Sequence, residues 1–381
     1  MKLIVFSIFS LNLIASVIVG AENTNAYINL ISNKNVALVV NQTSVVDSSY
    51  KKTTHLIDFL LSKNIKIKKL FALEHGIRGT HDAGEVVDST IDSTTGLEIV
   101  SLYGKNKTIK EKDIKEIDTL IFDIQDIGVR FYTYISSLKY VLDACAKFKK
   151  HCIVLDRPNP YANIVSGPVL DLKLKSFVGM YPIPITYGLT IGELAKMIVG
   201  EGWSKKLKLD IIPVLNWKRS DVYNLSIKPS PNLPNKKSIE LYPSLAPFEA
   251  TDVSVGRGTY RPFTHIGHPS LNHYDYYFIP RSIEGMSKNP KHKDEKCYGI
   301  DLSHENSSQK RGFTLKYIFK VFNEFTSSNF FISKSFFNKL VGVEYVYNDL
   351  VSGKSYDEVE VKWNKDLEAY KLIRERYLIY D

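Results

Sequence analysis

Cysteine is scarce in this chain of 381 residues, with 3 in all, and long basic runs are missing. A disulfide-stapled secreted scaffold would carry many more cysteines, and Cys145, Cys152 and Cys297 have no metal-ligand spacing. Without an arginine-rich arm, the net charge of +9 gives little support for nucleic acid, and we expect no such partner. The 23 tyrosines and 19 phenylalanines, by contrast, indicate a folded globular protein, because so much aromatic surface favours burial.

Three common sequence motifs of enzymes are also missing. Residues 41–44, which follow the first apolar run of the folded part, contain no glycine, and this disfavours a nicotinamide dinucleotide cofactor. A Gly-x-Ser-x-Gly motif for a serine nucleophile does not occur. The Gly256–Thr259 segment lacks the Lys-Ser/Thr pair of a phosphate-binding loop. These absences argue against nucleotide-dependent and serine-hydrolase chemistry.

The first residues have the composition of an export signal. Lys2 supplies a positive charge, residues 3–19 are mainly apolar, and residues 19–21 (Val-Gly-Ala) offer small side chains for cleavage before Glu22. We expect residues 1–21 to be a signal peptide and the mature chain to be exported, periplasmic or secreted. The alternative is an uncleaved membrane anchor, since the apolar run approaches the length of a membrane span. Membrane contact is expected only through such a segment, because a mean hydropathy of −0.14 excludes a polytopic membrane protein.

Short apolar runs alternate with helical patterns in the N-terminal half, which predicts βαβ units, a parallel sheet and an α/β fold. Strands are expected at residues 35–40, 67–73, 119–122 and 152–155, and helices at 55–61 and 132–149. The same domain continues through an extended segment at 182–187, a helix opened by a capping box at Thr190–Glu193, and a strand at 207–214. Residues 228–235 hold three prolines in eight positions and predict a linker. We therefore expect a catalytic domain at 22–228 and a C-terminal auxiliary domain at 236–381.

Polar side chains follow four of the predicted strands at the point where each ends. They are Asn41, Glu74, Asp123 and Asp156. In an open parallel sheet the carboxyl ends of the strands lie along one edge, where ligands bind, so these groups are expected around one crevice. The alternative is that they cap the helices that follow. Capping does not explain Glu74 and Asp156, because no helix begins directly after them.

The loop over residues 74–85 is the first candidate for chemistry. Its three glycines allow the backbone to approach a ligand closely, and Glu74 and Glu85 are the residue type of a glycosidase's paired carboxylates. Arg78 would keep one carboxylate ionised, while burial would raise the pKa of another. One alternative is an ordinary surface loop. The other is a metal site, made by Glu74, His75, His81 and Asp82.

The run over residues 123–134 places acids, an amide, an arginine and tyrosines at a strand end: Asp123, Gln125, Asp126, Arg130 and Tyr132. Such a set suits sugar binding, because ring faces stack on pyranose C–H surfaces while polar groups hold hydroxyls. The alternative is that the rings belong to the core and that Arg130 pairs with Asp126. Arg257, between two glycines, is a candidate clamp for a carboxylate or else part of an ordinary turn.

Long, ordered motifs of this chain resemble those of the NamZ-type exo-β-N-acetylmuramidases, a bacterial family long catalogued as a domain of unknown function. The likeness covers about residues 36–380. Its strongest segments are 74–79 (Glu-His-Gly-Ile-Arg-Gly), 83–85 (Ala-Gly-Glu), 122–134, 155–160 (Leu-Asp-Arg-Pro-Asn-Pro), 187–193 (Tyr-Gly-Leu-Thr-Ile-Gly-Glu), 241–244 (Leu-Tyr-Pro-Ser) and 254–259 (Ser-Val-Gly-Arg-Gly-Thr). Residues 248–252 read Phe-Glu-Ala-Thr-Asp and depart from a family Phe-Glu-Gly-Thr-Asn segment at two positions.

The resemblance implies a Rossmann-like parallel-sheet domain, a smaller α/β (α+β) C-terminal domain and an active site in the cleft between them. It also implies exo-acting release of N-acetylmuramic acid from non-reducing ends of peptidoglycan fragments by carboxylate acid/base catalysis, without nucleotide, metal or other cofactor. The implied partners are peptidoglycan-derived sugars, such as muropeptides and MurNAc-GlcNAc. Members of the family are exported and take part in cell-wall turnover and recycling.

Carried onto this sequence, the resemblance makes Glu74 the leading acid/base candidate, with Glu85, Asp123 and Asp126 as candidates for the second role. The residues expected to line the sugar site are His75, Arg78, Gln125, Arg130, Tyr132, Asp156, Arg157, Glu249 and Arg257. Two other functions stay open. One is a non-catalytic periplasmic muropeptide-binding protein that keeps the cleft, and the other is a metal-dependent hydrolase that uses the histidines near residue 75.

Overall fold

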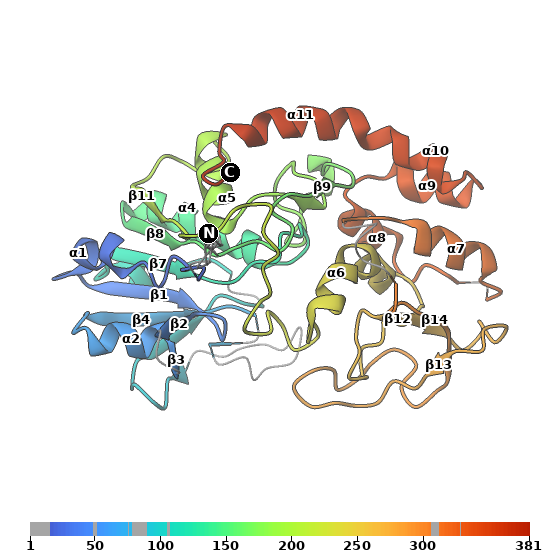
Figure 1. Ribbon diagram of the computed structural model, residues 1–381, viewed down its shortest axis with the longest axis horizontal. Coiled ribbons are helices and arrows are strands. Elements are labelled where there is room, and N and C mark those ends of the chain that lie inside the picture. The colour runs from blue at the N-terminus through green and yellow to red at the C-terminus, as the bar shows by residue number, and fades with distance from the viewer. Residues whose placement is uncertain are drawn as a thin grey trace, which may run out of the picture.

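The N-terminal half of the computed structural model folds around a seven-stranded sheet with the strand order β11-β8-β7-β1-β4-β6-β5 (Figure 1). The structure describes residues 16–48, 52–74, 76–77, 90–104, 107–305, 312–327 and 329–381. The strands of this sheet are β1 (Val36–Val40), β4 (Ile67–Ala72), β5 (Thr90–Ile91), β6 (Glu98–Ser101), β7 (Thr119–Asp123), β8 (His151–Leu155) and β11 (Leu209–Ile212). Neighbouring strands are parallel except at the edge, where β5 runs antiparallel to β6. The predicted α/β class is confirmed.

The order of the strands fixes where a ligand site is expected. From β1 the chain adds β4 and then β6 on one side, and it returns to add β7, β8 and β11 on the other side of β1. Connections therefore leave β1 and β7 in opposite directions, which opens a crevice outside the carboxyl ends of these two strands. This is the strand order of a Rossmann-like sheet.

Helices cover both faces of the sheet. In β1, Ala37 and Val39 belong to the same buried cluster as the apolar residues of α4 (Tyr134–Phe148) and α5 (Ile191–Gly200). Leu38 points to the other face and packs in a second cluster with α2 (Leu56–Ser62). Because β1, β7 and β8 are buried on both faces, their sequences are continuous apolar runs, which is why they were predictable.

A local sequence signal sets the start of α5. The predicted capping box of α5 is confirmed: the Thr190 hydroxyl accepts from Glu193 N, and the Glu193 carboxylate accepts from Thr190 N (2.9 Å). The smaller elements are η1 (Thr24–Ala26), α1 (Ile28–Ile31), the hairpin of β2 (Val45–Ser48) and β3 (Lys52–His55), α3 (Glu111–Ile114), η2 (Leu172–Leu174), and the pair β9 (Val165–Ser166) and β10 (Thr186–Tyr187).

The C-terminal part is a smaller mixed unit that begins after the predicted linker. It opens with α6 (Lys236–Leu245) and η3 (Ala246–Ala250), and a three-stranded sheet follows, ordered β12-β14-β13. These strands are β12 (His265–His268), β13 (Tyr277–Phe278) and β14 (Cys297–Asp301). The helices are α7 (Lys316–Glu324), α8 (Lys334–Val341), α9 (Tyr345–Val351), α10 (Tyr356–Glu360), η5 (Val361–Trp363) and α11 (Asn364–Glu375).

The last helix returns to the first domain. Figure 1 shows α11 running from α10 back toward α5, beside which the chain ends. Tyr370 OH donates to the Tyr187 carbonyl (2.7 Å), and Arg374 Nε donates to the Gly188 carbonyl (2.7 Å). The end of the segment expected as an auxiliary domain is therefore part of the packing of the N-terminal domain.

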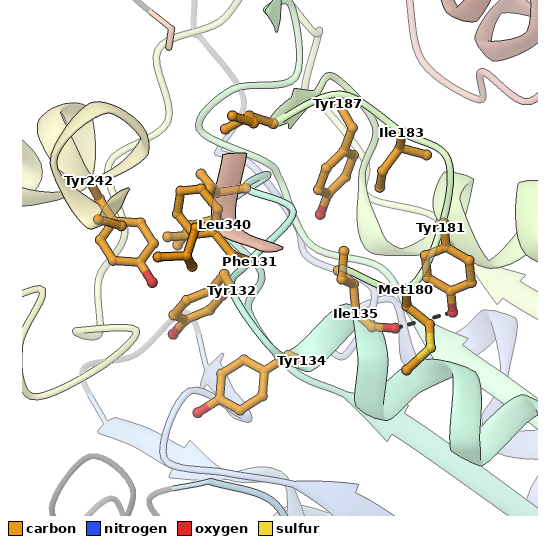
Figure 2. Close-up of a cluster of buried hydrophobic side chains, with 14 of the residues drawn as sticks. Phe131, Tyr132, Tyr134, Ile135, Met180, Tyr181, Ile183, Tyr187, Tyr242 and Leu340 are labelled. Atoms are coloured by element: carbon orange, nitrogen blue, oxygen red, sulfur yellow. Dashed lines mark hydrogen bonds between the residues drawn. The ribbon is translucent and has the colours of Figure 1, made fainter. Parts of the chain in front are cut away.

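A shared apolar core also joins the two parts. Figure 2 shows Tyr242 from α6 and Leu340 from α8 beside Phe131 and Tyr132, which lie between β7 and α4. The rings of Phe131 and Tyr242 meet edge to face with centroids 5.4 Å apart, and both side chains are buried. This contact fixes α6 against the carboxyl edge of the large sheet.

Residues 18–21, which we expected to end the signal peptide, pack against the folded domain. Ile18 and Leu215 exchange two backbone hydrogen bonds (3.0 and 2.8 Å), and Gly20 N donates to the Asp156 carbonyl (2.7 Å). A Cβ atom on Gly20 would lie 2.4 Å from Asp156 N, so the approach requires glycine. Within the ranges described above, no helix combines the length and the hydropathy needed to cross a membrane.

Candidate active site

Glu74 lies directly after β4 and is held by hydroxyl groups from two neighbouring segments. Tyr103 OH donates to Glu74 Oε1 (2.9 Å), and Thr133 Oγ1 donates to Oε2 (2.9 Å). Tyr134 OH donates to the backbone carbonyl of Glu74 (3.2 Å). Tyr103 follows β6, while Thr133 and Tyr134 lie at the start of α4 after β7, so two neighbouring parts of the sheet edge position the carboxylate.

The tyrosines around Glu74 are permanent hydrogen-bond donors. Burial, reinforced by the charge of Glu74, raises the pKa of Tyr103. Burial and the same carboxylate raise the pKa of Tyr134. Both phenols therefore remain protonated at neutral pH, and both keep Glu74 oriented.

Arg257 and Glu249 of the C-terminal part form an ion pair whose arginine lies within electrostatic range of Glu74. Arg257 Nε donates to Glu249 Oε1 (2.7 Å), and the guanidinium lies over the Phe263 ring at 5.1 Å. Burial lowers the pKa of Arg257, but Glu249 and, more weakly, Glu74 outweigh burial, so that the pKa is raised. The Arg257 and Glu249 side chains keep 26% and 24% of their surface exposed, so a ligand can reach this pair.

Tyr242 lies within electrostatic range of both Glu74 and the Arg257–Glu249 pair. Burial raises its pKa, and the charges of Glu249 and Glu74 act in the same direction, whereas Arg257 opposes them. One phenol thus lies within electrostatic range of carboxylates from both domains. The structure brings Glu74, Glu249, Arg257 and Tyr242 to one place.

Asp123, by contrast, is closed off by Arg157. Both side chains are buried, with Arg157 Nε donating to Oδ1 (2.6 Å) and Nη2 donating to Oδ2 (2.9 Å). Arg157 Nη2 also donates to the Val45 carbonyl (3.0 Å). This two-pronged pair satisfies both oxygens of Asp123 beneath the crevice at the ends of β1 and β7.

Asp126 is also directed into the protein. Its Oδ2 accepts from Gly128 N (2.7 Å) and from the hydroxyl of buried Tyr187. Among the described residues its buried Oδ1 has no hydrogen-bond partner. Burial raises the pKa of Asp126 to about 6, and the hydrogen bonds only partly oppose this.

Asp156 ties three distant segments together. Its carboxylate accepts from Gly192 N (2.8 Å) at the start of α5, from Thr190 Oγ1 (2.7 Å) and from Tyr380 OH (2.6 Å) near the end of the chain. Burial raises its pKa to about 6. These contacts hold the C-terminal segment against the first domain.

Arg130 braces the two domains instead of pairing with Asp126. Its two Nη atoms donate to four backbone carbonyls, those of Pro168 (2.7 Å), Ile183 (2.8 Å), Leu340 (3.0 Å) and Val341 (2.7 Å). Burial lowers its pKa to about 9. Because Leu340 and Val341 end α8, the guanidinium fixes the C-terminal part to the first domain.

Two further predicted site residues hold backbone close to the crevice. Tyr132 OH donates to the Pro229 carbonyl (2.6 Å), and Gln125 Nε2 donates to the carbonyls of Asp126 (2.8 Å) and Pro158 (2.7 Å). Three others, His75, Arg78 and Glu85, lie outside the described residues.

A cavity of about 280 Å³ lies elsewhere, between α6 and the loop over residues 222–229. Tyr161, Lys236 and Tyr317 are among the residues that line it, and none of the predicted site residues that the structure describes is. The cavity is thus separate from the carboxylates and from Arg257.

Sequence reasoning missed Tyr103, Thr133 and Tyr242. Tyr103 follows β6, a partly exposed strand that the apolar pattern did not reveal. Thr133 and Tyr242 lie inside segments that the family resemblance quoted, yet nothing in their spacing relates them to Glu74.

Comparison with known proteins agrees with this architecture. Family models of the exo-β-N-acetylmuramidase NamZ match the chain over residues 36–237 (N-terminal domain) and 240–380 (C-terminal domain). The peptidoglycan β-N-acetylmuramidase NamZ of Bacillus subtilis is 34% identical over 371 residues, covering 92% of this chain and 88% of that protein.

Crystal structures of two DUF1343 family proteins from Bacteroides fragilis are also similar. The first is 42% identical, with a TM-score of 0.86, and the match covers 96% of this chain and 99% of that one. The second is 28% identical, with a TM-score of 0.82 and the same coverage. The resemblance seen in the motifs is confirmed, and so is the prediction of an enzyme of the glycosidase class. The chain belongs to the exo-β-N-acetylmuramidase NamZ family.

Proposed function

We propose that this chain is an exported, exo-acting glycoside hydrolase that releases N-acetylmuramic acid from non-reducing ends of peptidoglycan fragments. The observation that carries the proposal is the position of Glu74, at the carboxyl edge of the sheet and within electrostatic range of Arg257 and Tyr242 from the other domain. The named activity of the Bacillus relative supports the substrate class. Arg257 and Glu249 are partly exposed, so a sugar end can reach them.

In this proposal Glu74 is the acid/base residue. A positioned carboxyl group that transfers a proton in the transition state contributes about 10²–10⁴-fold in rate. Arg157 binds both oxygens of Asp123, and Asp126 is buried with its Oδ2 bonded to the Tyr187 hydroxyl, which supports Glu249 as the second carboxylate among the described residues. Glu85 stays a candidate from the sequence.

Arg257 would hold the lactyl carboxylate that distinguishes muramic acid from glucosamine. A hydrogen bond between charged groups contributes about 1.5–3 kcal/mol, which is about a 10- to 100-fold preference. Arg257→Met should therefore lower kcat/KM for a muramic acid glycoside by about this factor and leave hydrolysis of the matching glucosaminide nearly unchanged. Equal losses on the two substrates would contradict a clamp on the lactyl group.

The direct test is mass spectrometry of the products formed from a defined disaccharide with muramic acid at its non-reducing end. We expect free N-acetylmuramic acid and the shortened acceptor, in the presence or absence of a chelator. Tight binding by calorimetry without sugar release would identify a muropeptide-binding protein. Activity that a chelator abolishes and added metal restores, with the melting temperature unchanged, would identify a metal-dependent hydrolase.

Export is part of the proposal and has its own test. Because Ile18 and Gly20 are bonded to the folded domain, we expect the leader to be removed upstream of Ile18 and not after Ala21. N-terminal sequencing of the exported protein checks this. A mature chain that begins at Glu22 would show that these backbone contacts are dispensable.

A further inference from the structure

Two histidines and one aspartate gather in the C-terminal part, outside the set of residues assigned to the sugar site. Asp252 follows η3, His268 ends β12, and His292 lies in the loop between β13 and β14. Their ligand atoms lie within 4.8 Å of one another. The three segments they come from are far apart in the sequence, so the fold, and not local spacing, creates the cluster.

The distances in this cluster fit the edges of a small coordination tetrahedron. His268 Nε2 is 3.1 Å from Asp252 Oδ2, and His292 Nε2 is 3.4 Å from Asp252 Oδ1. Metal–ligand bonds of about 2.0–2.1 Å in a tetrahedral zinc site separate neighbouring ligand atoms by about 3.3 Å. A cation placed between the three side chains can therefore reach all of them with small adjustments.

The surroundings of His268 suit a metal ligand. The imidazole is buried, with its ring centroid 4.7 Å from that of Phe325. Its second nitrogen, Nδ1, accepts from Ser270 N (3.0 Å) and lies 2.8 Å from Ser270 Oγ, which could accept from Nδ1 once a metal occupied Nε2. The charge of Glu295 also acts on this imidazole.

The cluster is joined to the Arg257–Glu249 pair through Lys291. The Lys291 ammonium donates to the carbonyls of Phe248 (3.3 Å) and Glu249 (3.1 Å), and its charge interacts with those of Glu249, Asp252 and Arg257. Without a metal, His292 Nε2 lies 2.6 Å from the Asp252 carbonyl and completes a hydrogen-bonded chain. Metal binding at Nε2 would leave each neutral imidazole with its one proton on Nδ1, and in His268 that proton can be donated to Ser270 Oγ.

We propose that Asp252, His268 and His292 form a binding site for one divalent transition-metal ion, Zn²⁺ above all, which fastens η3 and the Glu249 that it carries to the small sheet. Imidazole and carboxylate ligands select zinc and its neighbours over Mg²⁺ and Ca²⁺, which prefer sites made of oxygen alone. The ion acts here as a structural link. The ion would contact no substrate and would hold only the frame behind Glu249, so zinc uptake and melting temperature test this proposal separately from sugar release.

The test starts from the full-length protein stripped with a chelator and then dialysed. We expect the wild-type chain to take up one Zn²⁺ per molecule, measured by elemental analysis, and to melt at a higher temperature when the ion is present. Co²⁺ bound at the same place should give the intense visible absorption of a four-coordinate centre. Calcium should not compete.

Three variants and one control locate the site. Asp252→Asn, His268→Gln and His292→Gln should each weaken zinc binding at least about tenfold. His273→Gln, on an exposed histidine beside Glu324, should bind zinc as the wild type does. No stoichiometric uptake by the wild-type chain would overturn the proposal even if a variant failed to fold, and so would equal uptake by wild type and all three variants.

Discussion

The buried carboxyl of Asp126 offers a test of whether a predicted site residue is structural. Its pKa is raised from 3.8 to about 6, because burial favours the neutral form. The folded protein therefore binds more protons than the unfolded chain between these two values, and the free energy of unfolding should fall as the pH rises from about 4 to 6. The difference corresponds to about 3 kcal/mol for this one group.

Asp126→Asn removes that dependence. The amide can still accept from Gly128 N and the Tyr187 hydroxyl, but it cannot lose a proton. The amide NH2 that takes the place of Oδ1 lowers the free energy of unfolding by a further amount, but this amount does not vary with pH. Measured relative to wild type, the variant should therefore gain about 3 kcal/mol between about pH 4 and 7.

Urea unfolding at several pH values measures this difference. Asp275→Asn, on an exposed carboxylate of the C-terminal part, is the matched control and should change the free energy of unfolding by less than about 0.5 kcal/mol. A constant difference between Asp126→Asn and wild type over this range would refute the reasoning. A loss of sugar release of about 100-fold or more with the fold intact would make Asp126 a catalytic carboxylate.

Three further expectations concern the frame of the site. Arg130→Met should lower the free energy of unfolding by about 3–5 kcal/mol, because it removes a donor from four buried carbonyls, although Leu170 N still donates to that of Ile183, and calorimetry would detect this. Arg281→Met, on an exposed arginine, serves as its control. Tyr103→Phe should reduce kcat about tenfold with little change in KM, since it removes the phenol that donates to Glu74 Oε1. An unchanged kcat would show that Tyr103 does not position Glu74. Tyr380→Phe should loosen the C-terminal segment by about 1–3 kcal/mol, seen as faster amide exchange in α11.

The sequence predicted the centre of the fold better than its edges, for a physical reason. Strands such as β1 and β8 are buried on both faces, so they leave an unbroken apolar run that can be recognised without any tertiary information. The short strands β9 and β13 have two residues each, and the partly exposed β6 has a mixed pattern, so they were not recognisable, whereas β10 lies within the extended segment predicted at 182–187.

The site was predictable only in part, because strand-end carboxylates look alike in a sequence. Glu74 and Asp156 both follow apolar strands, but the contact that turns Asp156 inward comes from Tyr380, 224 residues away. Likewise the sequence predicted Arg130 to line the sugar site or to pair with Asp126, whereas its partners are backbone carbonyls, which every residue type provides. Only the folded chain shows which carboxylate remains at the crevice.

The role of Glu74 is tested most directly by the turnover of a chromogenic muramic acid glycoside by Glu74→Gln. We predict a loss of kcat of at least about 100-fold, with substrate binding and melting temperature close to those of the wild type. Glu284→Gln, on an exposed glutamate, should keep full activity. Activity of Glu74→Gln within a few-fold of wild type would contradict the account.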